Sequence, residues 1–100
     1  MIGVRLSPQE VEAIVKSAKE VFGNGVGVWL FGSRTDLTKR GGDIDLYIET
    51  EEGYDLEKLT RFLAKLYLRI GERKIDVILE KRGSDKEIAL EAKTKGVRLC

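Results

Sequence analysis

The chain has 100 residues, of which 42% are hydrophobic and 35% charged, a composition typical of one globular domain (residues 1–100) rather than a disordered chain. Its 18 basic and 17 acidic residues nearly cancel, so the overall charge favours neither a membrane partner nor direct nucleic-acid binding. The lack of histidine and the single cysteine, Cys100, exclude His-based catalytic triads, His/Cys zinc sites and an internal disulfide.

The first predicted elements are a helix and a buried strand. Ser7 is a candidate N-cap, Pro8 suits the first helical position, and Glu10 completes a capping box. Apolar residues recur at helical spacing as far as Gly23, which ends the helix; they are Val11, Ile14, Val15, Ala18, Val21 and Phe22. Residues 26–31, VGVWLF, are β-branched and aromatic and predict a buried strand.

Two further strands and two further helices are predicted. Residues 43–49, DIDLYIE, alternate between apolar and polar, and residues 74–80, KIDVILE, do the same. Between them, a helix begins near Asp55 and ends at Gly71, with an apolar stripe of Leu56, Leu59, Phe62, Leu63, Leu66, Tyr67 and Ile70. Ser84 and Glu87 predict a second capping box, opening a short helix that ends at Gly96.

This order of elements, α-β-β-α-β-α, predicts an α/β (α+β) fold with helices packed on a small mixed three-stranded sheet. The second and third strands are joined through a helix, so we expect them to be parallel neighbours with a right-handed crossover. The first and second strands are joined by an irregular loop and are expected to be antiparallel. With no secretion signal and no apolar run near the ~20 residues that span a bilayer, we expect a cytoplasmic protein.

Three aspartates stand in otherwise apolar strands. Asp43 and Asp45 are two residues apart and share one face of their strand, and Asp76 brings a third carboxylate if the next strand lies alongside. Two carboxylates about 4 Å apart repel by about 4 kcal/mol at an effective dielectric of 20, so such a group requires a cation or a proton. Oxygen ligands without His or Cys favour Mg²⁺ or Mn²⁺. For one aspartate alone, simple exposure to solvent is the better interpretation. For all three together, a shared cation site is the better one.

A Gly-Ser pair follows the first predicted strand. Gly32 lets the backbone approach a ligand closely, and Ser33 adds a hydroxyl and an amide, so the turn is a candidate phosphate site. Arg34 is a further candidate for phosphate contact, although a solvated loop explains it equally well. The stretch lacks the Gly-Lys-Ser/Thr ending of a Walker loop, and Tyr47 stands where an EF-hand loop would need its third ligand, so both alternatives are excluded.

These features occur together in FGSRTDLTKRGGDIDLYIE (residues 31–49), followed by KIDVILE, and there the chain resembles the minimal nucleotidyltransferases of the polymerase β superfamily. The family signature of Gly-Ser, Asp-x-Asp and a later Asp is matched by Gly32, Ser33, Asp43, Asp45 and Asp76. The resemblance implies the nucleotidyltransferase fold, a nucleoside triphosphate held at the Gly-Ser turn, and two Mg²⁺ ions held by the three aspartates. The implied reaction is nucleotidyl transfer to a hydroxyl with loss of pyrophosphate.

Standalone chains of this size in the family resemble antitoxins that accompany a helical HEPN-domain toxin. This implies ATP as donor, a toxin tyrosine as acceptor of AMP, and an acceptor surface supplied by that partner or by an oligomer. The sequence leaves open whether Asp76 also accepts the hydroxyl proton. It also leaves open two other functions, a catalytically silent module that neutralises a partner by contact and a transferase for small hydroxyl compounds.

Overall fold

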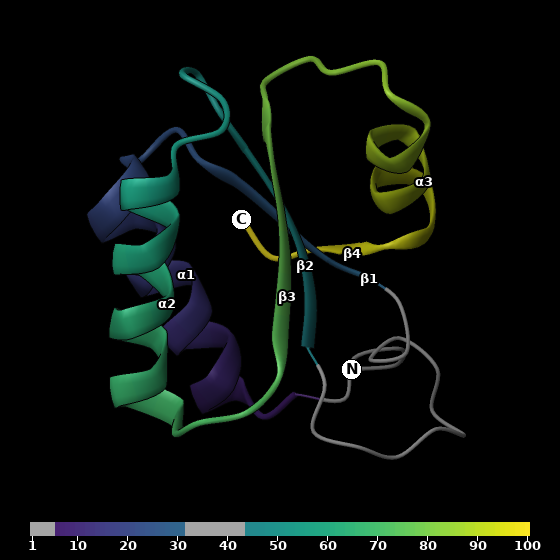
Figure 1. The fold of residues 1–100 in the computed structure, drawn as a ribbon. Coiled ribbons are helices and arrows are strands. Elements are labelled where there is room, and N and C mark those ends of the chain that lie inside the picture. Colours follow the sequence, from purple (N-terminus) through teal and green to yellow (C-terminus); the bar gives the residue numbers. More distant parts are fainter. Residues whose placement is uncertain (1–5, 32–43) are drawn as a thin grey trace.

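The computed structural model describes residues 6–31 and 44–100, in which three helices and four strands follow one another in the order α-β-β-α-β-α-β. The helices are α1 (Pro8–Phe22), α2 (Leu56–Ile70) and α3 (Glu87–Lys95). The strands are β1 (Gly27–Phe31), β2 (Ile44–Thr50), β3 (Ile75–Lys81) and β4 (Val97–Arg98). Figure 1 shows α1 and α2 together on one side of the sheet and α3 on the other.

The strands form one mixed sheet in the order β3-β2-β1-β4. The predicted antiparallel pairing of β1 with β2 and the parallel pairing of β2 with β3 are both confirmed, as is the α/β (α+β) class. The predicted number of three strands is wrong, because β4 pairs antiparallel with β1 as a fourth. A Cβ at Gly96 would lie 2.3 Å from the Ala92 carbonyl oxygen and 2.8 Å from that of Leu30, so only glycine fits between α3 and β4.

The N-terminus of α1 is capped as predicted. The Ser7 hydroxyl accepts a hydrogen bond from the Glu10 amide (3.1 Å), and the Glu10 carboxylate accepts one from the Ser7 amide (2.9 Å). The predicted capping box of α3 is wrong. Lys86 is the N-cap and no side chain caps the helix, since the Ser84 hydroxyl accepts from the Lys86 amide two residues on rather than from the Glu87 amide. The amide of Ser84 bonds the Lys81 carbonyl in a turn, so this serine belongs to the turn rather than to the helix.

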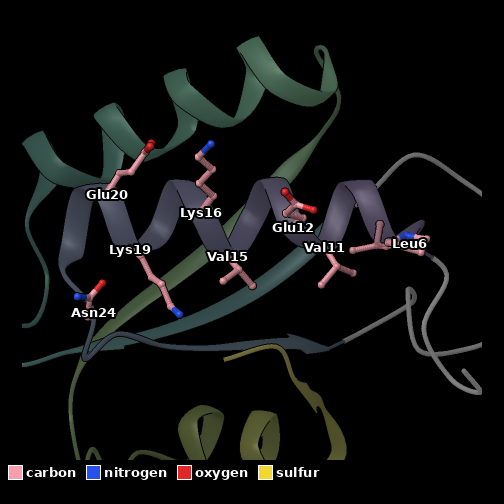
Figure 2. Close-up of a pocket in the computed structure, with 9 residues that line it drawn as sticks. Leu6, Val11, Glu12, Val15, Lys16, Lys19, Glu20 and Asn24 are labelled. Carbon is pink, nitrogen blue, oxygen red and sulfur yellow. The ribbon is translucent and has the colours of Figure 1, made fainter.

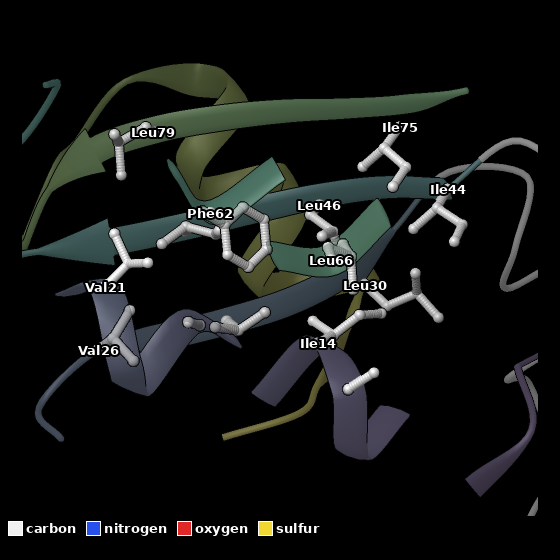
Figure 3. Packing of buried hydrophobic residues seen from close by; sticks show 14 of the residues in the cluster. Ile14, Val21, Val26, Leu30, Ile44, Leu46, Phe62, Leu66, Ile75 and Leu79 are labelled. Carbon is white, nitrogen blue, oxygen red and sulfur yellow. The ribbon is translucent and has the colours of Figure 1, made fainter. Parts of the chain in front are cut away.

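The main core lies between the sheet and the pair α1 and α2. Figure 3 shows Ile14 of α1 and Phe62 and Leu66 of α2 gathered against apolar side chains of β1, β2 and β3. The alternate residues of β2 predicted for this face, Ile44, Leu46 and Ile48, are all fully buried. Leu56 is the exception among the apolar residues predicted for the stripe of α2, because it is 63% exposed at the first residue of the helix.

A second, smaller core lies between the opposite face of the sheet and α3. Trp29 and Tyr47 are paired across β1 and β2, with ring centroids 5.7 Å apart, and α3 contributes Ala89 and Ala92. The small alanines let α3 lie close to the two rings. Both faces of the central strands are therefore covered where α3 lies.

A buried ion pair joins α3 to the sheet within this second core. Nζ of Lys93 lies 2.5 Å from Oε2 of Glu49, whose side chain is only 5% exposed. The Tyr47 hydroxyl donates to the same carboxylate oxygen at 2.7 Å, and Nζ of Lys93 also lies 5.6 Å from the centroid of the Trp29 ring. Burial alone would raise the pKa of the Glu49 carboxyl, but the hydrogen bonds from Lys93 and Tyr47 lower it below its usual value. Burial, together with the hydrogen bond to the Glu49 carboxylate, raises the pKa of Tyr47.

Replacing Lys93 by methionine should destabilise the protein. The substitution keeps much of the side-chain volume but leaves the buried Glu49 carboxylate without its cation, a change that costs roughly 3 kcal/mol. Urea unfolding followed by circular dichroism measures the loss. The matched control is Lys95→Met, which removes an exposed charge from the same last turn of α3 and should change the unfolding free energy far less. Equal effects of the two variants would show that the ion pair contributes nothing specific.

The stability of the fold should also depend on the ionisation of Glu49. Its pKa in the folded state lies below the ordinary value of 4.5, so its contribution is complete above that pH and is lost as the pH falls through the folded value. Glu49→Gln should therefore be less stable than the wild type at pH 7, and the difference should shrink as the pH is lowered from about 5 to about 3. Unfolding curves at each pH give the measurement. Glu51→Gln, at a side chain 80% exposed, is the control. Its difference in unfolding free energy from the wild type should change little over the same pH range.

Candidate active site

Asp45 and Asp76 face each other across two parallel strands. They are register partners in the pairing of β2 with β3, so their side chains project from the same face of the sheet. Neighbouring strands lie about 4.8 Å apart, which brings the two carboxylates within reach of one cation. Asp76 is exposed and Asp45 is half-buried. The expectation that Asp76 lies on the same side of the sheet as Asp45 is confirmed.

The register at this end of the sheet is fixed by both the backbone and the core. The Ile44 amide donates to the Lys74 carbonyl at 2.9 Å, directly before the two aspartates. Ile44 and Ile75, which are also register partners, are buried on the opposite face among the residues that contact α1 and α2. Each aspartate is therefore placed by the apolar residue that precedes it.

The end of β1 lies at the same place. Phe31, its last residue, is the register partner of Asp45, and Gly32 and Ser33 follow directly in the chain. Because β1 runs antiparallel to β2, its carboxyl end meets the amino ends of β2 and β3. Of the predicted site residues, Gly32, Ser33, Arg34 and Asp43 lie outside the described residues.

The donor chemistry of the described pair suits a hard cation. Asp45 and Asp76 offer only carboxylate oxygens, the ligands preferred by Mg²⁺ and Mn²⁺. Within residues 6–31 and 44–100, no three Asp, Glu, His or Cys side chains gather closely enough to hold a metal ion. A complete site in this position would need a further donor, and Asp43 is the predicted one.

The rest of the aspartate face is closed by α3. Tyr47, which lies on the same face of β2 as Asp45, is fully buried with its hydroxyl bonded to Glu49, so it belongs to the second core. The ion pair of Glu49 with Lys93 was not predicted. Its signal in the sequence was the same as for the aspartates, a carboxylate on the polar side of an apolar strand. For Glu49 the compensating cation is a lysine of the protein itself.

A groove along α1 is separate from the aspartates. It has a volume of about 990 Å³ and is lined mainly by residues of α1, including Val11, Val15 and Lys19 (Figure 2). The inner face of α1, with Ile14 and Ala18, packs on the side of the sheet opposite Asp45 and Asp76. The sheet therefore lies between the groove and the two carboxylates.

None of the helices in residues 6–31 and 44–100 is both long and apolar enough to cross a membrane.

Comparison with known proteins identifies the family of the chain. The model of the family described as "Polymerase beta, Nucleotidyltransferase" matches residues 9–100, which include the whole of the sheet and all but the first residue of the helices. A search of curated proteins found no match. The matched range contains Asp45, Asp76 and the end of β1 where they meet.

Asn substitution of either aspartate should weaken divalent-ion binding. Each change removes a charged oxygen ligand, so we expect Asp45→Asn and Asp76→Asn to lower the affinity for Mn²⁺ by about tenfold or more, as measured by isothermal titration calorimetry. The melting temperature should rise with Mn²⁺ in the wild type and much less in the variants. Glu80→Gln is the control, because Glu80 lies on the same face of β3 but pairs with Lys86 at 3.2 Å. Unchanged Mn²⁺ affinity in both Asn variants would rule out a metal site here.

Proposed function

Since the chain belongs to the polymerase β nucleotidyltransferase family, we propose that it transfers a nucleoside monophosphate, AMP from ATP, to a hydroxyl group in a reaction that depends on Mg²⁺ or Mn²⁺. The observation that carries this proposal is the register of β2 and β3. It sets Asp45 beside Asp76 on one face, next to the end of β1 from which the chain enters Gly32 and Ser33. Two carboxylates beside a candidate phosphate-binding turn, with Asp43 as the predicted third donor, suit metal-dependent nucleotidyl transfer.

Each site residue has a defined task in this proposal. Asp43, Asp45 and Asp76 would hold the metal ions, and the turn at Gly32 and Ser33 would bind the triphosphate through backbone amides and a hydroxyl. Arg34 would add positive charge against the phosphates. When bound, the ions supply charge that stabilises the attacking and leaving oxygens.

The chemistry of the transfer is a displacement at the α-phosphorus of ATP. The acceptor oxygen forms a bond to that phosphorus, and the bond from it to the oxygen bridging to the β-phosphate breaks. Pyrophosphate leaves with the electron pair. The acceptor proton passes to a base, and the exposed carboxylate of Asp76 is our candidate for this step.

We assign the acceptor to a partner protein, a tyrosine of a helical HEPN-type toxin that AMP attachment would silence, so the chain would act as an antitoxin. Support comes from the position of Asp76. It is exposed and lies on β3, which pairs only with β2 among the described strands. A side chain presented by another folded protein can therefore approach it from beyond the edge of the sheet. A long residue such as tyrosine suits that approach.

Label transfer tests the proposal directly. The chain is incubated with Mg²⁺, a candidate HEPN-type protein and ATP labelled at the α-phosphate, and we expect label to appear on that protein. ATP labelled at the γ-phosphate should give none, because pyrophosphate leaves. Asp45→Asn and Asp76→Asn should reduce transfer by about 100-fold or more, since each removes a group that stabilises the transition state. Glu80→Gln should retain most of it.

Two results would contradict the proposal. Transfer of the γ-label would identify a kinase. A stable complex with no transfer of either label would instead favour the silent module that neutralises its partner by contact. Replacing the modified tyrosine of the acceptor by phenylalanine should abolish labelling and confirms the hydroxyl as the nucleophile.

A further inference from the structure

Lys74 is an exposed cation at the end of the sheet where Asp45 and Asp76 lie side by side. It directly precedes β3, and its carbonyl accepts the hydrogen bond from the Ile44 amide. This bond continues the pairing of β2 with β3, so the alternation of side chains along β3 extends back to Lys74. Since Lys74 and Asp76 are two residues apart, their side chains project from the same face of the sheet.

The charge of Lys74 is not used in the described part of the fold. The preceding residue, Arg73, forms an ion pair with Glu10 in the first turn of α1, with Nη1 2.5 Å from Oε2. Lys74 itself makes no ion pair with any of residues 6–31 and 44–100. Of these two neighbouring cations, Arg73 therefore anchors the chain to α1, whereas Lys74 presents its ammonium group to solvent beside the aspartates.

Lys74 and Asp76 do not neutralise each other. Residues two apart on a strand are separated by about 7 Å at the backbone, and no ion pair joins these two side chains. At the other end of the same face, by contrast, Nζ of Lys93 lies 2.5 Å from the buried Glu49 carboxylate. A lysine that stays separate from two nearby carboxylates suits a ligand of mixed charge, such as a phosphate group that arrives with divalent cations.

The strand order indicates which phosphate of a nucleotide Lys74 would meet. The candidate triphosphate turn follows β1, and β2 lies between β1 and β3. In the reaction proposed above, the acceptor attacks the α-phosphorus and its proton passes to Asp76 on β3. The α-phosphate must then lie on the β3 side of the site, with the β- and γ-phosphates nearer the turn. Lys74 is the neighbour of Asp76 on the same face, so the α-phosphate is the group within its reach.

Resting on that proposed function, we propose that Lys74 binds ATP by donating a hydrogen bond from Nζ to a non-bridging oxygen of the α-phosphate. The ammonium group of lysine is a compact charge with three donors on a flexible four-carbon stem, and it is a common phosphate ligand. A positive charge at this position also offsets the negative charge of the phosphate, which would otherwise repel an attacking oxygen.

Nucleotide binding by the full chain tests this contact without catalysis. Isothermal titration calorimetry in the presence of Mn²⁺ uses α,β-methylene-ATP, in which the bond that would break in the reaction is replaced. Lys74→Met should weaken binding by about tenfold, because it removes a charged hydrogen-bond donor, and Lys74→Arg should retain most of the affinity. The matched control is Lys81→Met, at an exposed lysine at the far end of β3 and on its other face. Circular dichroism verifies that each variant is folded.

AMP tests the assignment to the α-phosphate, because this is the only phosphate that AMP carries. Lys74→Met should weaken the binding of AMP by about the same factor as that of the ATP analogue, and Lys81→Met should change neither. A loss of affinity for the ATP analogue alone would place Lys74 at the β- or γ-phosphate and overturn the assignment.

The remaining outcomes separate this inference from the proposed function. If the wild type binds neither nucleotide, both fail. If the wild type binds the analogue and Asp45→Asn does not, but Lys74→Met binds as well as Lys81→Met, only the role of Lys74 is overturned. Urea unfolding without nucleotide adds an independent measurement, in which we expect Lys74→Met to be as stable as Lys81→Met. A marked loss of stability in Lys74→Met alone would identify a structural counter-charge and overturn the inference.

Discussion

The parallel register of β2 with β3 is the constraint on which both the core and the site depend. Side chains alternate along a strand, so a slip of one residue would turn Asp76 into the apolar core and bring Ile75 and Leu79 out of it. Burial of each of these two side chains contributes about 1.5–3 kcal/mol. Repulsion between two carboxylates about 5 Å apart is about 3 kcal/mol at an effective dielectric of 20, and water around the exposed Asp76 reduces it further. The apolar face therefore determines the register, and the aspartates follow it.

The opposite face of β2 holds carboxylates in two different ways. Glu49 is covered by α3, and a lysine of that helix supplies the positive charge that a buried carboxylate needs. Asp45 lies four residues earlier on the same face of β2. Its neighbour on β3 is a second carboxylate, the exposed Asp76. A charge supplied from solution suits this pair, because the Asp76 side chain is exposed. The strand β2 thus carries a structural carboxylate, Glu49, near its end and one member of the candidate catalytic pair, Asp45, near its start.

Sequence patterns predicted those parts of the fold that depend on local chemistry and on regular alternation. The capping box of Ser7 and Glu10, the ends of α2, and the two faces of β2 all depend on residues close together in the chain. The strand β4 has only two residues, too few to show alternation, and is defined by its pairing with β1. Ser84 and Glu87 have the spacing of a capping box, but Ser84 belongs to a turn in which its amide donates to the Lys81 carbonyl.

The candidate site was predictable for a related reason, whereas the ion pair of the neighbouring Glu49 was not. Asp45 and Asp76 precede apolar residues of parallel strands at equivalent positions, so the hydrophobic pattern alone aligns them. The partner of Glu49 is Lys93, which lies on α3 far along the chain, and only the packing of α3 brings the two together. A charge pair between distant elements leaves no periodic signal in a sequence.

The surface that we assign to the acceptor lies on the side of the sheet away from α1 and α2. Asp45 and Asp76 project from the face of the sheet that α3 partly covers, whereas α2 packs on the opposite face. Figure 1 shows α2 and α3 separated by the strands. Because β3 lies at the edge of the sheet, an acceptor can reach Asp76 without displacing any described strand.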